Sequence, residues 1–268
     1  HTQIPDPTPM VTSPRIRVAL SAACATALAL AAPIIEASPA RAADTITAAD
    51  QPYFAYYHLD QARAKGYTGK GVTVAIIDGK VDTSANELNG ATITDKTPCT
   101  VTVTPESTGH GTGTASILVA RDYGVVPDAT LLAYQTDAGD ADPGSDCTGI
   151  GGINLAGYPS LINHAINDGA QIINLSAGSS DHSNELRWAI ARAIHRGILI
   201  TGSAGNEARD ANNKHLGWWS GVVGVSAVDQ NGAFASYSSW GQGVTTAAVG
   251  GPVITRDYPS NAFVETYG

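Results

Sequence analysis

Five short apolar runs constrain the fold of this 268-residue chain more than any other feature. Each run is rich in Val, Ile or Leu and is bounded by glycine or by polar turn residues, which is typical of a strand buried on both faces. Such strands occur in parallel sheets that helices cover. The sequence therefore predicts parallel strands at Val72–Ile77, Ala129–Gln135, Ala170–Ser176, Gly197–Ser203 and Gly221–Val228.

Helical patterns lie between these runs. The clearest begins after Ser183, with Glu185 early, Arg196 late and Gly197 as the stop signal. Strands that alternate with helices predict an α/β fold with a mostly parallel, twisted sheet flanked by helices. In such folds, functional side chains gather at the carboxyl ends of the strands. The expected helices are Thr112–Arg121, Ile153–Asp168 and Ser183–Arg196.

The first part of the chain has the three regions of a secretory signal peptide. Two arginines follow Met10, an uncharged run spans Val18–Ala32, and small residues surround Arg41. The apolar run is shorter than the about 20 residues of a membrane-spanning helix; a buried Ala-rich helix is the alternative. We expect a secreted protein in which residues 1–9 lie outside the fold, 10–42 are removed and 43–66 form an N-terminal segment.

Secretion favours a disulfide between Cys99 and Cys147, because Cys24 would leave with the signal peptide. Two buried free thiols are the alternative.

The net charge is −9, with a pI near 5.1 and no basic run, which argues against binding to nucleic acid or to anionic membranes. The segment Asp137–Cys147 contains four aspartates, and clustered oxygens suit calcium. Their spacing fits no EF-hand loop, so we favour a solvated acidic loop and predict no cofactor.

Two titratable residues suggest catalysis. Asp78 directly follows a predicted buried strand, and His110 lies between two glycines ahead of a predicted helix. A helix N-terminus disfavours imidazolium, so His110 would rest neutral and would need a carboxylate to stabilise its protonated form. Asp78 would supply that carboxylate and fix the tautomer. A turn aspartate and a capping histidine are the structural alternatives.

A third polar element is the loop Gly202–Ala208, which follows another predicted strand. The amide of Asn206 can donate a hydrogen bond to an oxyanion without titrating. Asn206 as a turn residue that tolerates left-handed geometry is the alternative.

Together these segments resemble the subtilisin-like serine proteases, or subtilases (peptidase family S8). The matching segments are VTVAIIDG around Asp78, GHGTGTASI around His110, IINLSAG ending at Gly178, ITGSAGNE around Asn206, and VVGVSAVDQNGAFASYSSWG. The resemblance covers about residues 67–268 and implies a three-layer subtilisin-like domain.

The resemblance implies a secreted serine endopeptidase. In it Asp78 orients the base, His110 is the general base and Asn206 helps to form the oxyanion hole. Two segments would be edges of the substrate cleft and would pair with an extended peptide. These segments are Ser176, Ala177 and Gly178, and Ser203, Ala204 and Gly205.

The nucleophile of the family lies in a Gly-Thr-Ser motif, which does not occur in these 268 residues. Ser203, Ser238 and Ser239 lack its helix-start context. Two interpretations remain: the sequence is a fragment that stops just before the serine, with its C-terminal part incomplete, or it is a non-catalytic, peptide-binding pseudoprotease. We favour the fragment and expect the 268-residue chain itself to be inactive.

Further departures from the family pattern bear on the branch and on rival functions. Gly79 stands where Ser or Thr usually follows the aspartate, and the short segment before Gly71 resembles the mycosin-like branch. A cell-wall association would then depend on sequence beyond this chain. Gly109, Gly111 and Gly113 do not form a dinucleotide-binding fingerprint. We expect a monomer that acts on a peptide or protein substrate.

Overall fold

The computed structural model describes residues 45–137, 146–176, 178–179, 181–210 and 215–268. The predicted signal peptide (10–42), the residues before it, and 138–145 of the acidic segment lie outside the described residues. The described residues belong to one compact unit. Within this part of the chain, no helix has the length and apolar character needed to cross a membrane.

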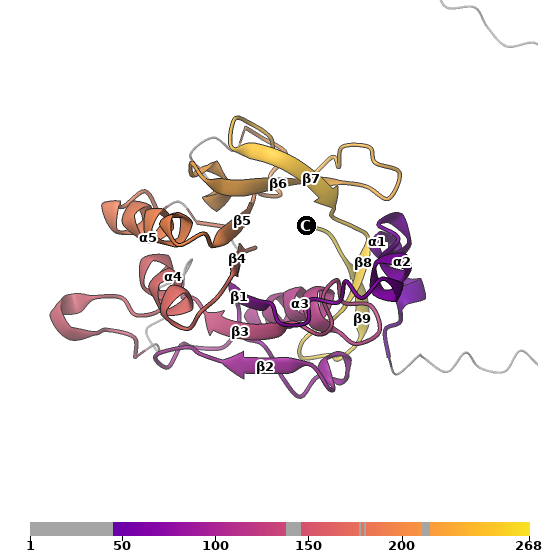
Figure 1. Cartoon of the computed structure of the whole chain (residues 1–268), viewed down its shortest axis with the longest axis horizontal. Coiled ribbons are helices and arrows are strands. Elements are labelled where there is room, and N and C mark those ends of the chain that lie inside the picture. Colours follow the sequence, from indigo (N-terminus) through magenta and orange to yellow (C-terminus); the bar gives the residue numbers. More distant parts are fainter. Residues whose placement is uncertain (1–44, 138–145, 177, 180, 211–214) are drawn as a thin grey trace, which may run out of the picture. The chain divides into compact units, whose positions relative to one another are not determined.

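A seven-stranded sheet forms the centre of this unit (Figure 1). Its strand order is β2-β3-β1-β4-β5-β6-β7, and every neighbouring pair is parallel. The strands are β1 (Thr73–Asp78), β2 (Thr92–Asp95), β3 (Thr130–Gln135), β4 (Ile172–Leu175), β5 (Leu199–Ser203), β6 (Val222–Val228) and β7 (Val244–Val249). A separate antiparallel hairpin consists of β8 (Val253–Arg256) and β9 (Phe263–Thr266).

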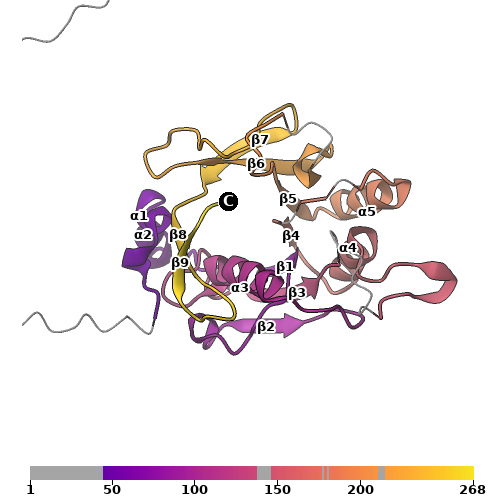
Figure 2. The ribbon, with the colours of Figure 1, turned by 180° about the vertical axis from the view of Figure 1, so that it is seen from behind.

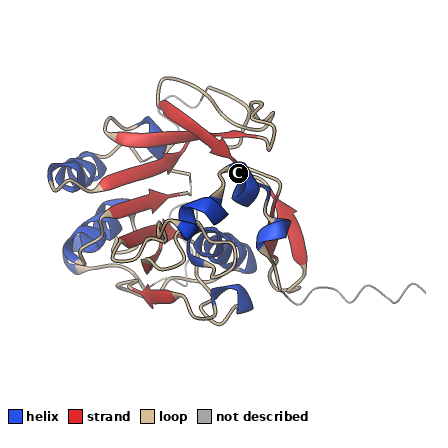
Figure 3. Cartoon of the chain, turned by 45° about the vertical axis from the view of Figure 1, so that its right-hand side comes forward, coloured by secondary structure: helices blue, strands red, loops and turns tan. Residues whose placement is uncertain are grey.

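Helices cover both faces of the sheet (Figure 2, Figure 3). The side chains of β1 alternate: Val74 and Ile76 lie in the cluster that contains residues of α3, whereas Ala75 and Ile77 lie in the cluster of α4 and α5. Burial of each isoleucine contributes about 1.5–3 kcal/mol. The predicted three-layer α/β fold is therefore confirmed. The covering helices are α3 (Pro105–Val119), α4 (Tyr158–Asn167) and α5 (Asn184–His195).

All five predicted strands are present, as β1, β3, β4, β5 and β6, whereas β2 and β7 were not predicted. These two strands lie at the edges of the sheet, and neither contains a fully buried residue. An edge strand with a solvated face lacks the continuous apolar run that identified the others.

The start of the helix predicted at Thr112–Arg121 was wrong: this helix is α3, and it begins at Pro105. Thr104 is the N-cap, with its hydroxyl accepting a hydrogen bond from the Ser107 amide, and proline suits the first helical position. Three glycines in the following turns obscured this start in the sequence pattern. The predictions for α4 and α5 differ from the structure mainly at their ends.

Residues 45–66 pack against the end of α3 and against β8. The side chain of Gln51 is 1% exposed and exchanges two hydrogen bonds with the backbone of Ile254, at 2.7 and 3.1 Å. Arg63 donates hydrogen bonds to three carbonyl groups just beyond α3. The elements of this segment are η1 (Ala48–Asp50), α1 (Pro52–Tyr56) and α2 (Leu59–Ala64). The other 3-10 helices are η2 (Asn86–Leu88), η3 (Ile150–Gly152) and η4 (Leu216–Trp218).

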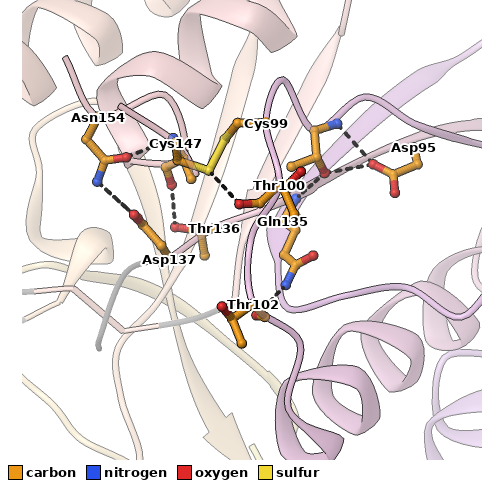
Figure 4. The surroundings of a disulfide bond; sticks show 11 residues. Asp95, Cys99, Thr100, Thr102, Gln135, Thr136, Asp137, Cys147 and Asn154 are labelled. Atoms are coloured by element: carbon orange, nitrogen blue, oxygen red, sulfur yellow. Dashed lines mark hydrogen bonds between the residues drawn. A yellow bond between two sulfur atoms is a disulfide. The ribbon is translucent and has the colours of Figure 1, made fainter. Parts of the chain in front are cut away.

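Cys99 and Cys147 form a disulfide, with their Cα atoms 5.1 Å apart (Figure 4). The bond joins the segment before α3 to the segment after β3, where the amide of Asp146 also donates to the carbonyl of Thr100. The disulfide predicted from the sequence is present in the structure.

Replacing both cysteines by serine should lower the free energy of unfolding by about 4 kcal/mol, because the bond closes a loop of 48 residues in the unfolded chain. Urea unfolding of the two proteins measures the difference. Equal unfolding midpoints and slopes, or two titratable thiols in the unreduced protein, would contradict this expectation.

Candidate active site

Asp78 is the last residue of β1, at the carboxyl edge of the sheet, and is fully buried. Its Oδ1 accepts a hydrogen bond from the amide of Gly79 at 2.6 Å. Its Oδ2 is buried and has no hydrogen-bond partner among the described residues. A buried carboxylate with one oxygen unpaired exerts a strong negative potential on any group beside it.

His110 is the group that lies beside this carboxylate. Its Nδ1 is 2.5 Å from Oδ1 of Asp78, and its side chain is 54% exposed. The hydrogen bond and the charge of Asp78 raise the pKa of His110, against the lowering effect of burial. His110 lies in the second turn of α3 and not ahead of the helix, so the expectation that a helix N-terminus keeps it neutral was wrong.

Two glycines allow α3 to approach β1 this closely. A Cβ atom on Gly79 would lie 2.0 Å from the carbonyl oxygen of Ser107, and one on Gly111 would lie 2.4 Å from the carbonyl oxygen of Gly79. Both are overlaps with backbone atoms, which side-chain rotation cannot relieve. The hydroxyl of Ser107 also accepts from the amide of Lys80 at 3.2 Å. The glycine after Asp78 therefore permits the backbone contact that places His110 beside the carboxylate.

The other predicted segments follow β4, which is next to β1, and β5, which is next to β4. Because β1, β4 and β5 are parallel neighbours, Ser176 after β4 and Ser203 at the end of β5 lie at the same edge as Asp78. Ser176 accepts a hydrogen bond from the Asn174 amide, and Ala204 is buried. Ala177 lies outside the described residues. Gly178 and Gly205 both lie against a buried histidine, His215, that the sequence patterns did not single out.

Asn206 is exposed and lies next to the C-terminal residue. A Cβ atom on Gly268 would be 3.4 Å from the side-chain nitrogen of Asn206, and the amide of Gly268 donates to the carbonyl of Gly250. Figure 1 marks this C-terminus. The last residue of the sequence is thus held beside the amide that was predicted to bind an oxyanion.

Ser238 and Ser239 are not available as nucleophiles. They are 1% and 0% exposed. The hydroxyl of Ser238 accepts from the amide of Ala227, and that of Ser239 donates to the carboxylate of Glu207. Both hydroxyls therefore stabilise loops.

The geometry at Asp78 and His110 suits proton transfer. A carboxylate that accepts from Nδ1 fixes the hydrogen there and leaves a lone pair on Nε2, which can take a proton from a hydroxyl group. Among the described residues, no three His, Cys, Asp or Glu side chains gather as a metal site. The predicted alternative of calcium at the acidic segment concerns mainly residues outside the described part. A surface groove beside α4 and α5, near Asn163 and Trp188, contains none of the predicted site residues.

Comparison with known proteins relates the chain to one family. A family model described as the subtilase family matches residues 69–267. The chain is 33% identical over 220 residues to a thermostable alkaline protease of Halalkalibacterium halodurans, covering 80% of this chain and 56% of that protein. It is 30% identical over 220 residues to subtilisin DY of Bacillus licheniformis, covering 78% and 75%. The chain thus spans little more than half the length of the first of these relatives.

Solved structures share the fold. The prenylagaramide maturation protease PagA matches with a TM-score of 0.62 and 23% identity, over 78% of this chain and 73% of that chain.

Replacing Asp78 by Asn should lower the pKa of His110, because the hydrogen bond and the charge that raise it are lost while the lowering effect of burial remains. The proton on His110 stabilises the wild-type fold fully below the unfolded pKa, and this stabilisation is lost as the pH rises through the higher folded pKa. NMR titration of the imidazole ring measures the pKa of His110 in the wild-type protein and in the variant. An unchanged pKa would show that Asp78 does not act on His110.

Replacing Gly79 by Ala should separate α3 from β1, lower the free energy of unfolding by about 1–3 kcal/mol and lower the pKa of His110. Gly109→Ala is the matched control, because its Cβ would lie 3.8 Å from its nearest neighbours. The control should keep the pKa and gain up to about 1 kcal/mol of helix stability. Equal effects of the two substitutions on the pKa would contradict the proposed role of Gly79.

Proposed function

Because this chain belongs to the subtilase family, we propose that it carries the acid, the base and the oxyanion-binding amide of a secreted serine endopeptidase. The observation that carries the proposal is the contact between Asp78 and His110 at the carboxyl edge of the sheet, 2.5 Å from Oδ1 to Nδ1. A partly exposed base held by a fully buried carboxylate is the arrangement that activates a serine hydroxyl.

His110 acts through Nε2. This atom takes the proton of the nucleophile as the hydroxyl oxygen attacks the peptide carbonyl, and it then gives the proton to the leaving amine. Asp78 keeps the ring in the required tautomer and stabilises the imidazolium that forms. The raised pKa of His110 means that activity should increase as the pH rises through that pKa, because only the neutral ring is a base.

Asn206 stabilises the negative charge on the carbonyl oxygen of the tetrahedral intermediate. Its exposed amide donates without titrating, and one such donor contributes about 10²- to 10³-fold in rate. We place the nucleophile in sequence downstream of Gly268. The membership of the subtilase family supports this, since Ser238 and Ser239 are buried and hydrogen-bonded.

The substrate is an extended peptide or protein segment. The segments after β4 and β5, with Ser176 and Gly178 on one side and Ser203 to Gly205 on the other, form the edges along which it pairs. The protein is secreted through the signal peptide at 10–42 and acts as a monomer. The acidic net charge of −9 argues against a nucleic-acid substrate.

A pseudoprotease that binds peptides without cutting them is the second candidate. It is the alternative that the test below must separate from the endopeptidase, because the 268 residues contain no Gly-Thr-Ser motif. The buried, hydrogen-bonded hydroxyls of Ser238 and Ser239 leave neither of them as a substitute nucleophile.

The test uses the natural protein extended past Gly268. It should hydrolyse peptides, and His110→Ala should lower turnover by about 10⁶-fold, while Asn206→Ala should lower it by about 10²- to 10³-fold. Steady-state kinetics on a peptide substrate measure the turnover of the extended protein and of both variants.

His195→Ala is the control for the loss of an exposed histidine, since it lies at the end of α5. Full activity of His110→Ala would refute the proposed base. An extended protein that binds peptides with no Gly-Thr-Ser motif and no hydrolysis would establish the pseudoprotease.

A further inference from the structure

The hairpin of β8 and β9 packs against the part of α3 that carries His110 (Figure 2). A Cβ atom on Gly109 would lie 3.8 Å from the carbonyl oxygen of Arg256. One on Gly113, a turn further along, would lie 3.3 Å from the side chain of Thr255. The hairpin therefore covers the helix face that these two glycines share.

The opposite face of α3 meets the residues that follow β1. Successive residues of a helix are about 100° apart, so a Cβ atom on Gly111 would point nearly opposite to those on Gly109 and Gly113. It would meet the backbone of residues 79–80, as described above. The glycine-rich part of α3 is thus enclosed between this backbone and the hairpin, and His110 projects between the two covered faces.

Two interactions join the hairpin to the segment after β1, and we call them the hairpin clamp. The guanidinium of Arg256 donates to both carboxylate oxygens of Glu87, at 2.6 and 3.2 Å, and these side chains are 13% and 3% exposed. The hydroxyl of Tyr258 donates to the carboxylate of Asp82 at 2.9 Å. The amide of Asp82 in turn donates to the hydroxyl of Thr112 in α3 at 3.0 Å. The clamp therefore contacts the helix as well as joining the segments on either side of it.

Arg256 fixes the orientation of the hairpin as well as its distance. Its guanidinium also donates to the carbonyl of Asn261 at 3.2 Å and lies 5.0 Å from the centre of the Phe263 ring. Two parallel hydrogen bonds to one carboxylate require a planar fork, which an ammonium group does not provide. The pair with Glu87 thus sets how β8, β9 and the turn between them sit against η2.

The helix needs such support more than most. Gly109, Gly111 and Gly113 lower its intrinsic stability, so its position depends on tertiary contacts. The contact that matters chemically is short, 2.5 Å from Nδ1 of His110 to Oδ1 of Asp78. A displacement of about 1 Å at a catalytic group can cost about 10²-fold in rate.

We propose that the hairpin clamp positions the base, by holding the glycine-rich part of α3 where His110 meets Asp78. The residues of the clamp are positioning residues, because they act on the base through the helix. This inference rests on the proposed function for the role of His110 as a base. The contact itself can be measured without a nucleophile.

Two substitutions that conserve charge test the proposal in the 268-residue chain. Arg256→Lys removes the forked pair but keeps the cation, and Tyr258→Phe removes only the hydroxyl. The double variant should lower the pKa of His110 by about half a unit or more, because its contact with Asp78 weakens while every formal charge remains. The proton on Nδ1 should also move upfield as this hydrogen bond lengthens. NMR titration of the imidazole ring measures both quantities.

Arg121→Lys is the matched control. Arg121 lies just beyond the other end of α3, where it pairs with the carboxylate of Asp128. The control should leave the pKa of His110 and its Nδ1 resonance unchanged. A double variant with the wild-type pKa and resonance, whatever its stability, would overturn the proposal. If the double variant fails to fold, Tyr258→Phe alone decides by the same two readouts.

Kinetics of the protein extended past Gly268 separate this inference from the proposed function. The double variant should lower turnover about tenfold and keep KM within about twofold, because the clamp acts on the base and not on substrate binding. Hydrolysis with equal turnover in wild type and double variant would overturn the inference and leave the endopeptidase in place. A lowered pKa of His110, with no hydrolysis by the wild type, would support the positioning role and refute the endopeptidase.

Discussion

The candidate site depends on a backbone contact between α3 and the residues that follow β1. Gly79 and Gly111 face each other where any side chain would overlap backbone atoms. This contact places His110, which is partly exposed, beside Asp78, which is fully buried. The difference in burial matters chemically, because the carboxylate orients the ring from the protein side and leaves the second ring nitrogen to a reacting group.

The parallel sheet supplies the rest of the arrangement. Since β1, β4 and β5 follow one another in the sheet, their carboxyl ends bring the proposed acid and the two proposed cleft edges to one side. The loop after β5 then places two adjacent residues in different surroundings. Asn206 is exposed toward the region that Gly268 enters, whereas Glu207 holds the buried ring of His215.

Sequence patterns predicted what depends on continuous burial. The five central strands have apolar runs, and Asp78 directly follows one of them. The edge strands lack such runs. The glycines in the first turns of α3 weaken its helical sequence pattern, so the start of this helix was not predicted. The contact of Gly79 with Ser107, and the pairing of His215 with Glu207, depend on how distant segments meet. No local pattern encodes these contacts, which is why His215 was missed.

Labelling with a serine-directed phosphonylating reagent, followed by peptide mapping, tests the central claim most directly. The natural protein extended past Gly268 should acquire one adduct, on a serine shortly after Tyr267-Gly268, and His110→Ala should slow the labelling strongly. An adduct on Ser203, Ser238 or Ser239, or labelling that is indifferent to His110, would contradict the account in which Asp78 and His110 activate a downstream serine.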